Sequence, residues 1–455
     1  MPRALTSPWG ALAALIGATL IVTVSATEAG VFLPLAILAV GYMAWSFTRP
    51  VVAVVTIILM HAYVFEQSAD ISILELAIGV YLYSYLAFWF FHHWLFSRTP
   101  FIRTASDRLL ILFLVICVVS VVMILVRGAS AEFWFRESLT LSSLLLTFPA
   151  REAMRTEKGL AAVFLAFALL VGTLAIVNLV QYRASSLAAN YFWEITSSRK
   201  PFGSALYSGL AVGAASLYAH ATSWRTRAPS LVLAVVGAMA LGTTFYRGFW
   251  IAAAIGVAAL FIMVNGRIRV RLLWTMLFGG VAVAGIGFVL FGDLLGFIAQ
   301  AFWSRIASSG TAMADVSVTN RLAESRSVLA MVVDSPIVGH GIGVSFPHFN
   351  IITRTTQILM YVHNAYVYLL LKVGIIGLVI FMGYFGLAIR DGVRLSRAAS
   401  VSPLRLAMVR AALGMFLGYV FVATNSGILQ DKQVLLVMIL GTAVIASSVK
   451  ECPSR

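Results

Sequence analysis

One histidine in this sequence stands where it could move a proton. His363 lies at the boundary between a polar segment and a long apolar stretch, within Tyr361-Val362-His363-Asn364-Ala365-Tyr366. An imidazole exchanges a proton near neutral pH, so His363 is a candidate general base, and Asn364 and Tyr366 beside it are candidates for binding a substrate. A boundary histidine more often serves only as an interfacial hydrogen-bonding residue, and that alternative stays open.

Basic residues form a second group of candidates. Arg247 lies in the short turn between two apolar segments. Arg199 and Lys200 end a polar loop, and Arg321 opens a predicted helix. Guanidinium forks bind phosphate oxygens and stay ionised in half-buried sites. Each could instead reach to the membrane surface or pair with an acid such as Glu324. For Arg247 we favour phosphate binding, because no acidic residue is near it in the sequence.

The composition shows what must position these residues. Of 455 residues, 61% are hydrophobic and only 11% are charged, against roughly 25% charged in a typical soluble protein. The two cysteines are too few for a disulfide framework, and no pair of histidines has a metal-ligand spacing. These observations exclude a soluble enzyme, a disordered chain and a secreted disulfide scaffold. They predict a membrane protein without metal or cofactor.

The apolar residues group into segments of the length that crosses a bilayer. They lie near residues 9–26, 31–48, 51–66, 71–91, 109–126, 137–150, 159–181, 201–222, 229–246, 248–264, 272–292, 362–389, 406–424 and 432–449. Two of these segments are short, and loss of one adjacent pair would leave both ends of the chain on the same side. We therefore predict an all-α polytopic integral membrane protein with about 12–14 transmembrane helices.

The net charge of +15 reports the topology. If the N-terminus is cytoplasmic, the inner loops hold 20 of the 32 basic residues and 5 of the 17 acidic ones. The whole excess of positive charge then lies on the cytoplasmic side, as in other membrane proteins. This distribution predicts that both termini are cytoplasmic, and it makes a nucleic-acid partner unnecessary.

One polar region is large enough to carry irregular structure. It covers residues 293–361 and separates an N-terminal bundle, residues 1–292, from C-terminal transmembrane helices, residues 362–455. We expect this outer loop to contain short helices and to carry the function, because irregular polar backbone is tolerated outside the membrane.

The outer loop contains a recognisable helix. Thr319 or Asn320 can cap it, and it continues to Val333. Leu322, Leu329 and Val333 recur at helical spacing, so we expect that face to lie on the membrane or on the bundle. The following Gly339-His340-Gly341-Ile342-Gly343 is interpreted as a turn that returns the chain to the bundle, in preference to a phosphate-binding loop.

These motifs together resemble a known family. Asn320-Arg321, Asp334-Ser335-Pro336 to Gly343, His363-Asn364-Ala365-Tyr366 and Lys372-Val373-Gly374 to Leu378 are similar to the signature of the O-antigen ligase and polysaccharide polymerase superfamily. Tyr246-Arg247-Gly248 resembles the arginine-glycine turn that precedes this signature in the family. The resemblance covers residues 243–381, in order, spacing and outward location.

The resemblance implies a fold similar to the GT-C-type membrane glycosyltransferases. It implies a metal-independent enzyme of the bacterial inner membrane, facing the periplasm, that takes a saccharide from a polyprenyl diphosphate carrier. The acceptor would be a hydroxyl of another glycan or of a lipid A core. His363 matches the family's catalytic histidine. Arg247, and less closely Arg199 or Arg321, match the arginines that contact the diphosphate.

One residue departs from the pattern. The family often has an acidic residue two positions before the glycine at Gly374, whereas this chain has Lys372. On a regular helix Lys372 would lie roughly 13 Å from His363 and on the opposite face. Lys372 is therefore not expected to touch the reacting atoms, and it is a candidate marker of a different acceptor.

Two other functions remain open. A transporter or flippase for a lipid-linked saccharide would predict charges deep inside several spans and internal repeats, and the sequence shows few such charges and no clear repeat. A non-catalytic assembly protein would predict that His363 and Arg247 can be replaced without loss of activity.

Overall fold

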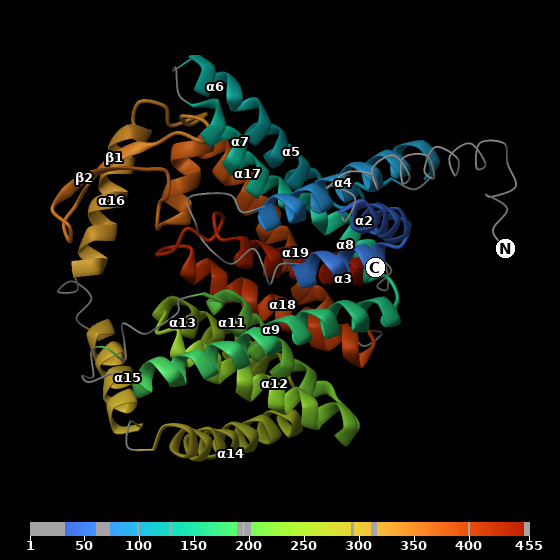
Figure 1. Cartoon of the computed structure of the whole chain (residues 1–455), viewed down its shortest axis with the longest axis vertical. Coiled ribbons are helices and arrows are strands. Elements are labelled where there is room, and N and C mark those ends of the chain that lie inside the picture. The colour runs from blue at the N-terminus through green and yellow to red at the C-terminus, as the bar shows by residue number, and fades with distance from the viewer. Residues whose placement is uncertain are drawn as a thin grey trace, which may run out of the picture.

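The computed structural model describes residues 32–60, 73–97, 100–126, 130–188, 194, 202–292, 295–310, 316–398 and 401–449. Within these residues the chain is mainly helical, and strands form only a two-stranded hairpin (Figure 1). The predicted all-α polytopic membrane fold is confirmed.

The helices and strands follow one another in this order. The first part contains α2 (Phe32–Phe47), α3 (Pro50–Met60), α4 (Ile73–Phe96), α5 (Ala105–Val119), α6 (Val121–Val126), α7 (Ala131–Ser142), the 3-10 helix η4 (Ser143–Leu146), α8 (Thr147–Ala153) and α9 (Glu157–Leu187). The second part contains α11 (Ser204–His220), α12 (Trp224–Thr243), α13 (Arg247–Met263), α14 (Gly266–Phe291), α15 (Leu295–Gly310), α16 (Val316–Val332), β1 (Phe346–Asn350), β2 (Thr355–Leu359), α17 (Ala365–Ser396), α18 (Pro403–Val422) and α19 (Lys432–Ser448).

Several helices match the predicted spans. Among the described residues, six helical segments are long and apolar enough to cross a membrane: α5 with α6, α9, α12, α14, α17 and α18. Shorter apolar helices lie in α2, α3, α13 and α19. The predicted span at residues 137–150 is divided among α7, η4 and α8. The predicted span near residues 9–26 lies outside the described residues.

Helix α18 is the centre of the bundle. It packs on α11, α13, α17 and α19, and most of its spanning segment is buried. Gly414 and Gly418 face Gly256 and Ala252 of α13 so closely that an added Cβ would lie 2.8 and 2.6 Å from backbone oxygens. Small residues allow this approach, as in other membrane helix pairs. The α13–α18 contact fixes the position at which α13 begins, and therefore that of Arg247.

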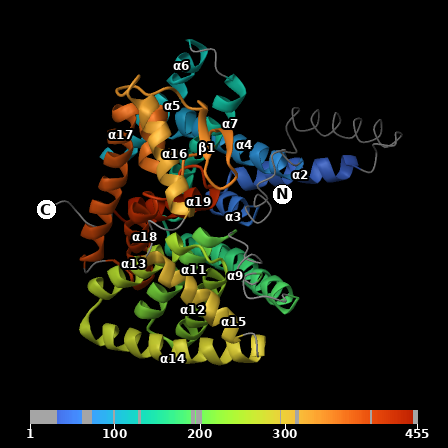
Figure 2. The same cartoon turned by 90° about the vertical axis from the view of Figure 1, so that its left-hand side faces the viewer.

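The outer loop contains more than the predicted helices. Besides α15 and α16 it forms the antiparallel hairpin of β1 and β2, with Phe346 opposite Leu359 and Asn350 opposite Thr355. Figures 1 and 2 show α15, α16 and the hairpin together along one side of the bundle. The expected helices are therefore present, and the hairpin is an addition that the sequence did not predict.

Helix α16 turns its two buried polar residues toward the rest of the protein. The helix begins at Val316, before the predicted cap at Thr319 or Asn320, and it buries Asn320, Glu324, Val328 and Val332. Leu322, Leu329 and Val333 are exposed, Val333 by 76%. Of the two surroundings expected for this face, the membrane or the bundle, the bundle is excluded. In a membrane protein an apolar face can point outward, and the inward face of α16 carries its two polar contacts.

Helix α17 is interrupted by a single glycine. Gly374 has φ 65° and ψ −169°, a conformation essentially restricted to glycine. The segment after α16 pairs with the opened backbone: Ile375 N–H donates to Pro336 O (2.9 Å), and His340 N–H donates to Leu371 O (2.7 Å). Gly339, Gly341 and Gly343 all have positive φ. The turn predicted for the glycine alternation is thus confirmed, and it supplies partners for backbone groups that a straight helix would satisfy internally.

Replacing Gly374 should destabilise the protein. A Cβ at this position would lie 2.2 Å from Ile337 O. The unfavourable backbone conformation alone costs about 1–3 kcal/mol. We expect Gly374→Ala to lower the temperature of unfolding in detergent. The measurement is size-exclusion chromatography of samples heated to increasing temperatures. The matched control is Gly386→Ala in the same helix, where an added Cβ meets nothing within 4 Å. Equal melting of the two variants would contradict the role given to the break.

Candidate functional site

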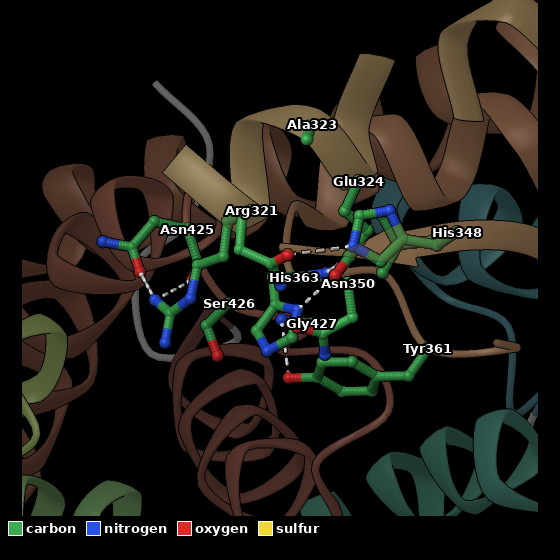
Figure 3. A network of polar contacts seen from close by, with 12 residues as sticks. Arg321, Ala323, Glu324, His348, Asn350, Tyr361, His363, Asn425, Ser426 and Gly427 are labelled. Atoms are coloured by element: carbon green, nitrogen blue, oxygen red, sulfur yellow. Dashed lines mark hydrogen bonds and ion pairs between the residues drawn. The ribbon is translucent and has the colours of Figure 1, made fainter. Parts of the chain in front are cut away.

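His363 is held by a carboxylate that comes from another helix. The Nδ1 atom of His363 lies 2.8 Å from Glu324 Oε2, and the backbone N–H of His363 donates to Glu324 Oε1 at 2.7 Å. The side chain of Glu324 is 1% exposed, whereas that of His363 is 32% exposed. One carboxylate of α16 therefore fixes both the backbone and the ring of His363, just before α17 begins (Figure 3).

This contact determines which nitrogen of His363 is available. A carboxylate only accepts hydrogen bonds, so the neutral ring carries its proton on Nδ1 and its lone pair on Nε2. Tyr361 meets the ring edge to face, with the ring centroids 4.7 Å apart. The arrangement leaves a half-exposed imidazole with Nε2 ready to accept a proton, which is what a general base requires.

Asn364 and Tyr366 have structural roles next to the histidine. Asn364 caps α17, and its Oδ1 accepts from the backbone N–H of Tyr366 and of Val367. The hydroxyl of Tyr366 donates to Val420 O at 2.8 Å. Both side chains thus fix the start of α17 against α18, and the substrate-binding role predicted for them stays a prediction.

Arg321 contacts the loop between α18 and α19. Its guanidinium donates to Asn425 Oδ1 (2.9 Å) and to Asn425 O (3.1 Å). The alternative in which Arg321 pairs with Glu324 is wrong, since the carboxylate of Glu324 pairs with His363 instead. Figure 3 shows Arg321, Asn425 and His363 close together.

The same loop reaches two tyrosines. Tyr246 donates its hydroxyl to Ser426 Oγ at 3.0 Å, and the backbone N–H of Gly427 donates to the hydroxyl of Tyr361 at 3.2 Å. Burial raises the pKa of Tyr361 to about 12, so its hydroxyl stays neutral at physiological pH. Residues 425–427 therefore contact Tyr246, which precedes Arg247. They also contact Arg321 and Tyr361, whose ring packs on His363.

Arg247 opens helix α13 at the edge of a large apolar groove. Phe245, two residues earlier, has φ 51°, an uncommon conformation for a bulky residue, and is buried between Tyr182 and Trp250. The groove has a volume of about 1330 Å³, and Arg247 is its one charged lining residue among the described part of the chain. Mostly apolar residues of α9, α11, α12, α13, α14 and α15 line the rest. The N-terminus of α13 adds a partial positive charge beside the guanidinium.

Lys372 has a role that its spacing from His363 does not reveal. It is completely buried, and its Nζ donates to Glu137 Oε2 and to Val344 O, both at 2.8 Å. The other oxygen of Glu137 accepts from Gln430 Nε2 at 2.9 Å, and Gln430 Oε1 accepts from Val362 N–H at 3.4 Å. A chain of contacts thus leads from Lys372 to the residue before His363. The role in acceptor choice suggested for Lys372 stays a prediction.

Sequence reasoning found some of these residues and missed others. Arg199 and Lys200 lie outside the described residues. Glu324 appeared in the sequence only as a partner for an arginine, and Asn425-Ser426-Gly427 was not singled out. The signal for that loop was present, because it is a polar run between two apolar spans.

Among the described residues, no group of three or more His, Cys, Asp and Glu side chains is arranged to hold a metal ion. Glu324 uses both carboxylate oxygens on His363.

Comparison with known families identifies the region that carries this site. Residues 230–382 match the family model described as O-antigen ligase. The resemblance seen in the sequence is confirmed over this region, which includes Arg247, Arg321, Glu324 and His363. The loop at Asn425 lies beyond it. No curated protein matches the chain.

Replacing Glu324 by glutamine should reverse the protonation of the His363 ring. The backbone N–H of His363 can only donate, so it would face the amide oxygen and leave the amide NH₂ against Nδ1. Nδ1 would then accept, and the proton would move to Nε2. We expect nitrogen NMR of histidine-labelled Glu324→Gln protein to show the ring proton of His363 on Nε2 instead of Nδ1. The His363 signals are identified by their loss in His363→Gln. The control is Asp334→Asn, an exposed acid after the same helix. An unchanged His363 signal in Glu324→Gln would argue against the proposed contact.

Proposed function

We propose that this protein, in which residues 230–382 match the family model described as O-antigen ligase, is a membrane glycosyltransferase. It transfers a saccharide from a polyprenyl diphosphate carrier to an acceptor hydroxyl, on the periplasmic face of the bacterial inner membrane. The observation that carries the proposal is the pairing of Nδ1 of His363 with the buried Glu324, which in the neutral ring puts the lone pair on Nε2 of a half-exposed imidazole.

His363 acts on the acceptor. Its Nε2 takes the proton of the acceptor hydroxyl as the oxygen forms its bond to the anomeric carbon. The bond between that carbon and the phosphate oxygen breaks, and its electron pair leaves with the diphosphate. Glu324 stabilises the imidazolium that results, as carboxylates do for other catalytic histidines. A positioned general base of this kind contributes about 10²- to 10⁴-fold in rate.

Arg247 acts on the donor. Negative charge develops on the departing diphosphate, and a fixed guanidinium at a helix N-terminus is suited to stabilise it. The apolar groove behind Arg247 has the chemistry and the volume, about 1330 Å³, for part of an isoprenoid chain. Arg321 and the 425–427 loop lie between the elements that carry Arg247 and His363, so they are suited to contact the transferred sugar or the diphosphate.

The same chemistry serves two kinds of enzyme. A ligase would use a lipid A core as acceptor, and a polymerase would use the end of another glycan. The glycan made by a deletion strain distinguishes them, because loss of chain length indicates a polymerase and loss of attachment indicates a ligase. A flippase would leave the His363–Glu324 pair without a chemical role.

Transfer should not require a divalent metal ion. In this mechanism the guanidinium of Arg247 supplies the positive charge that a metal supplies elsewhere. We expect purified enzyme, given a lipid-linked glycan and an acceptor, to keep its turnover in the presence of EDTA. Loss of turnover that magnesium or manganese restores would refute this part of the mechanism.

His363 and Arg247 should fail in different ways. His363→Ala should lower turnover by about 10²- to 10⁴-fold, because the general base is gone, while the donor still binds. Arg247→Ala should weaken donor binding and turnover together. Arg247→Lys should restore both only in part, since an ammonium is a point charge and not a fork. Donor binding and turnover are measured separately on purified protein.

A matched variant controls for general effects of charge and folding. Arg326→Ala removes an exposed arginine from α16 and should leave both measurements unchanged. Each variant is first shown to be monodisperse. Normal turnover of well-folded His363→Ala would exclude the general-base role, whatever the family match.

A further inference from the structure

A second polar cavity lies at the end of the bundle opposite to His363. It has a volume of about 240 Å³ and lies between the end of α4, the loop before α5, helix α8 and the end of α19. Its charged and polar lining includes His93, Arg103, Arg151, Glu152, Arg155 and Ser447. We call it the inner basic cavity. Neither the family match nor the proposed transfer reaction assigns it a role.

Two arginines at this end of the bundle form ion pairs within the protein. Arg151 donates to Asp107 Oδ2 at 2.8 Å, and both side chains are buried. Arg405 is also buried; it pairs with Glu157 and donates to Met154 O and Ser447 Oγ. The charges of these two arginines are balanced by nearby acids, so they hold helices together.

Two other groups that line the cavity lack such partners in the described part of the chain. Among the described residues, the guanidinium of Arg155 has no hydrogen bond or ion pair, and the buried Nε2 of His93 has no partner. Glu152 accepts from Trp89 Nε1 at 2.8 Å. Arg103 donates from Nε to Pro100 O at 2.8 Å, and the carboxylates of Glu152 and Asp107 both lie near its charge.

The basic groups also lie close enough to disfavour one another. Burial, followed by the neighbouring guanidinium groups of Arg151 and Arg155, lowers the pKa of Arg103. An anion bound between Arg103 and Arg155 would relieve this repulsion. The fork geometry of the two side chains suits phosphate oxygens.

The surroundings of the cavity are those of a membrane surface. The last turn of α4, which carries His93, also exposes Trp94 by 77% and Phe96 by 72%. Aromatic residues of this kind are enriched at the boundary of a bilayer. A lipid headgroup in the cavity would place its acyl chains beside these side chains.

We propose that the inner basic cavity binds a phosphate group, and that its source is the headgroup of an anionic phospholipid in the adjacent leaflet. Arg103 and Arg155 hold the phosphate oxygens, and His93 Nε2 carries a hydrogen that is donated to the headgroup. Basic pockets between transmembrane helices bind anionic headgroups in this way. The site is independent of the transfer reaction, because it lies at the other end of the bundle.

The test compares lipids that differ in charge. Purified full-length protein is equilibrated with phosphatidylglycerol or phosphatidylcholine in mixed micelles, and bound lipid is counted by native mass spectrometry. Arg103→Gln and Arg155→Gln should each weaken phosphatidylglycerol binding by about fivefold and leave phosphatidylcholine binding unchanged. Arg155→Lys should lose less. The matched control is Arg225→Gln, an exposed arginine at the start of α12, which should bind as the unmodified protein does.

A second measurement separates the lipid from a soluble anion. Inorganic phosphate is titrated against the same variants, with the melting temperature as readout. Phosphate that stabilises the unmodified protein but neither Gln variant, together with the loss of phosphatidylglycerol binding, supports the proposal. Equal phosphatidylglycerol binding by all variants overturns the lipid source, even if phosphate binds. Absence of both effects in variants with unmodified melting temperatures overturns the site.

Discussion

The carboxylate of Glu324 is the contact on which the candidate site depends. A buried carboxylate is costly unless donors surround it, and here both donors come from one residue, the backbone and the ring of His363. This requirement fixes α16 against the start of α17. One turn earlier, Asn320 Oδ1 accepts from His348 Nε2 and from Ile351 N–H of the hairpin. The inward face of α16 therefore positions the histidine and the hairpin together.

The second constraint is the backbone opened at Gly374. Its carbonyl and amide groups pair with residues 336–341, and the following glycines turn toward Glu137. Glu137 in turn holds Lys372 and Gln430. An ion pair of this burial is not in itself a source of stability, but loss of one partner leaves a buried charge. Glu324 holds His363 from one side, and these contacts together hold the chain on the other side.

Much of the fold could be predicted because apolar segments of membrane-spanning length dominate the sequence. His363 and Arg247 could be found because a charged or titratable residue at the edge of a span is unusual. Glu324 could not be assigned to His363, since 39 positions and the hairpin separate them in sequence. The sequence left open whether the apolar face of α16 lies on the membrane or on the bundle, because helical spacing alone does not distinguish the two surroundings. Here Asn320 and Glu324 point inward, and Leu322 and Val333 point outward.

Arginines at the two ends of the bundle have different roles, and their contacts distinguish these roles. Arg151 and Arg405 form ion pairs with carboxylates and donate to backbone carbonyls, so their charge is balanced within the fold. Arg321 donates to the neutral Asn425 and, among the described residues, to no carboxylate. Arg247 is the charged residue of an apolar groove, where a compensating anion would be stabilised by the low dielectric around it. The place of this guanidinium at the edge of an apolar groove of about 1330 Å³ supports the proposal that an anionic lipid carrier binds at this end of the protein.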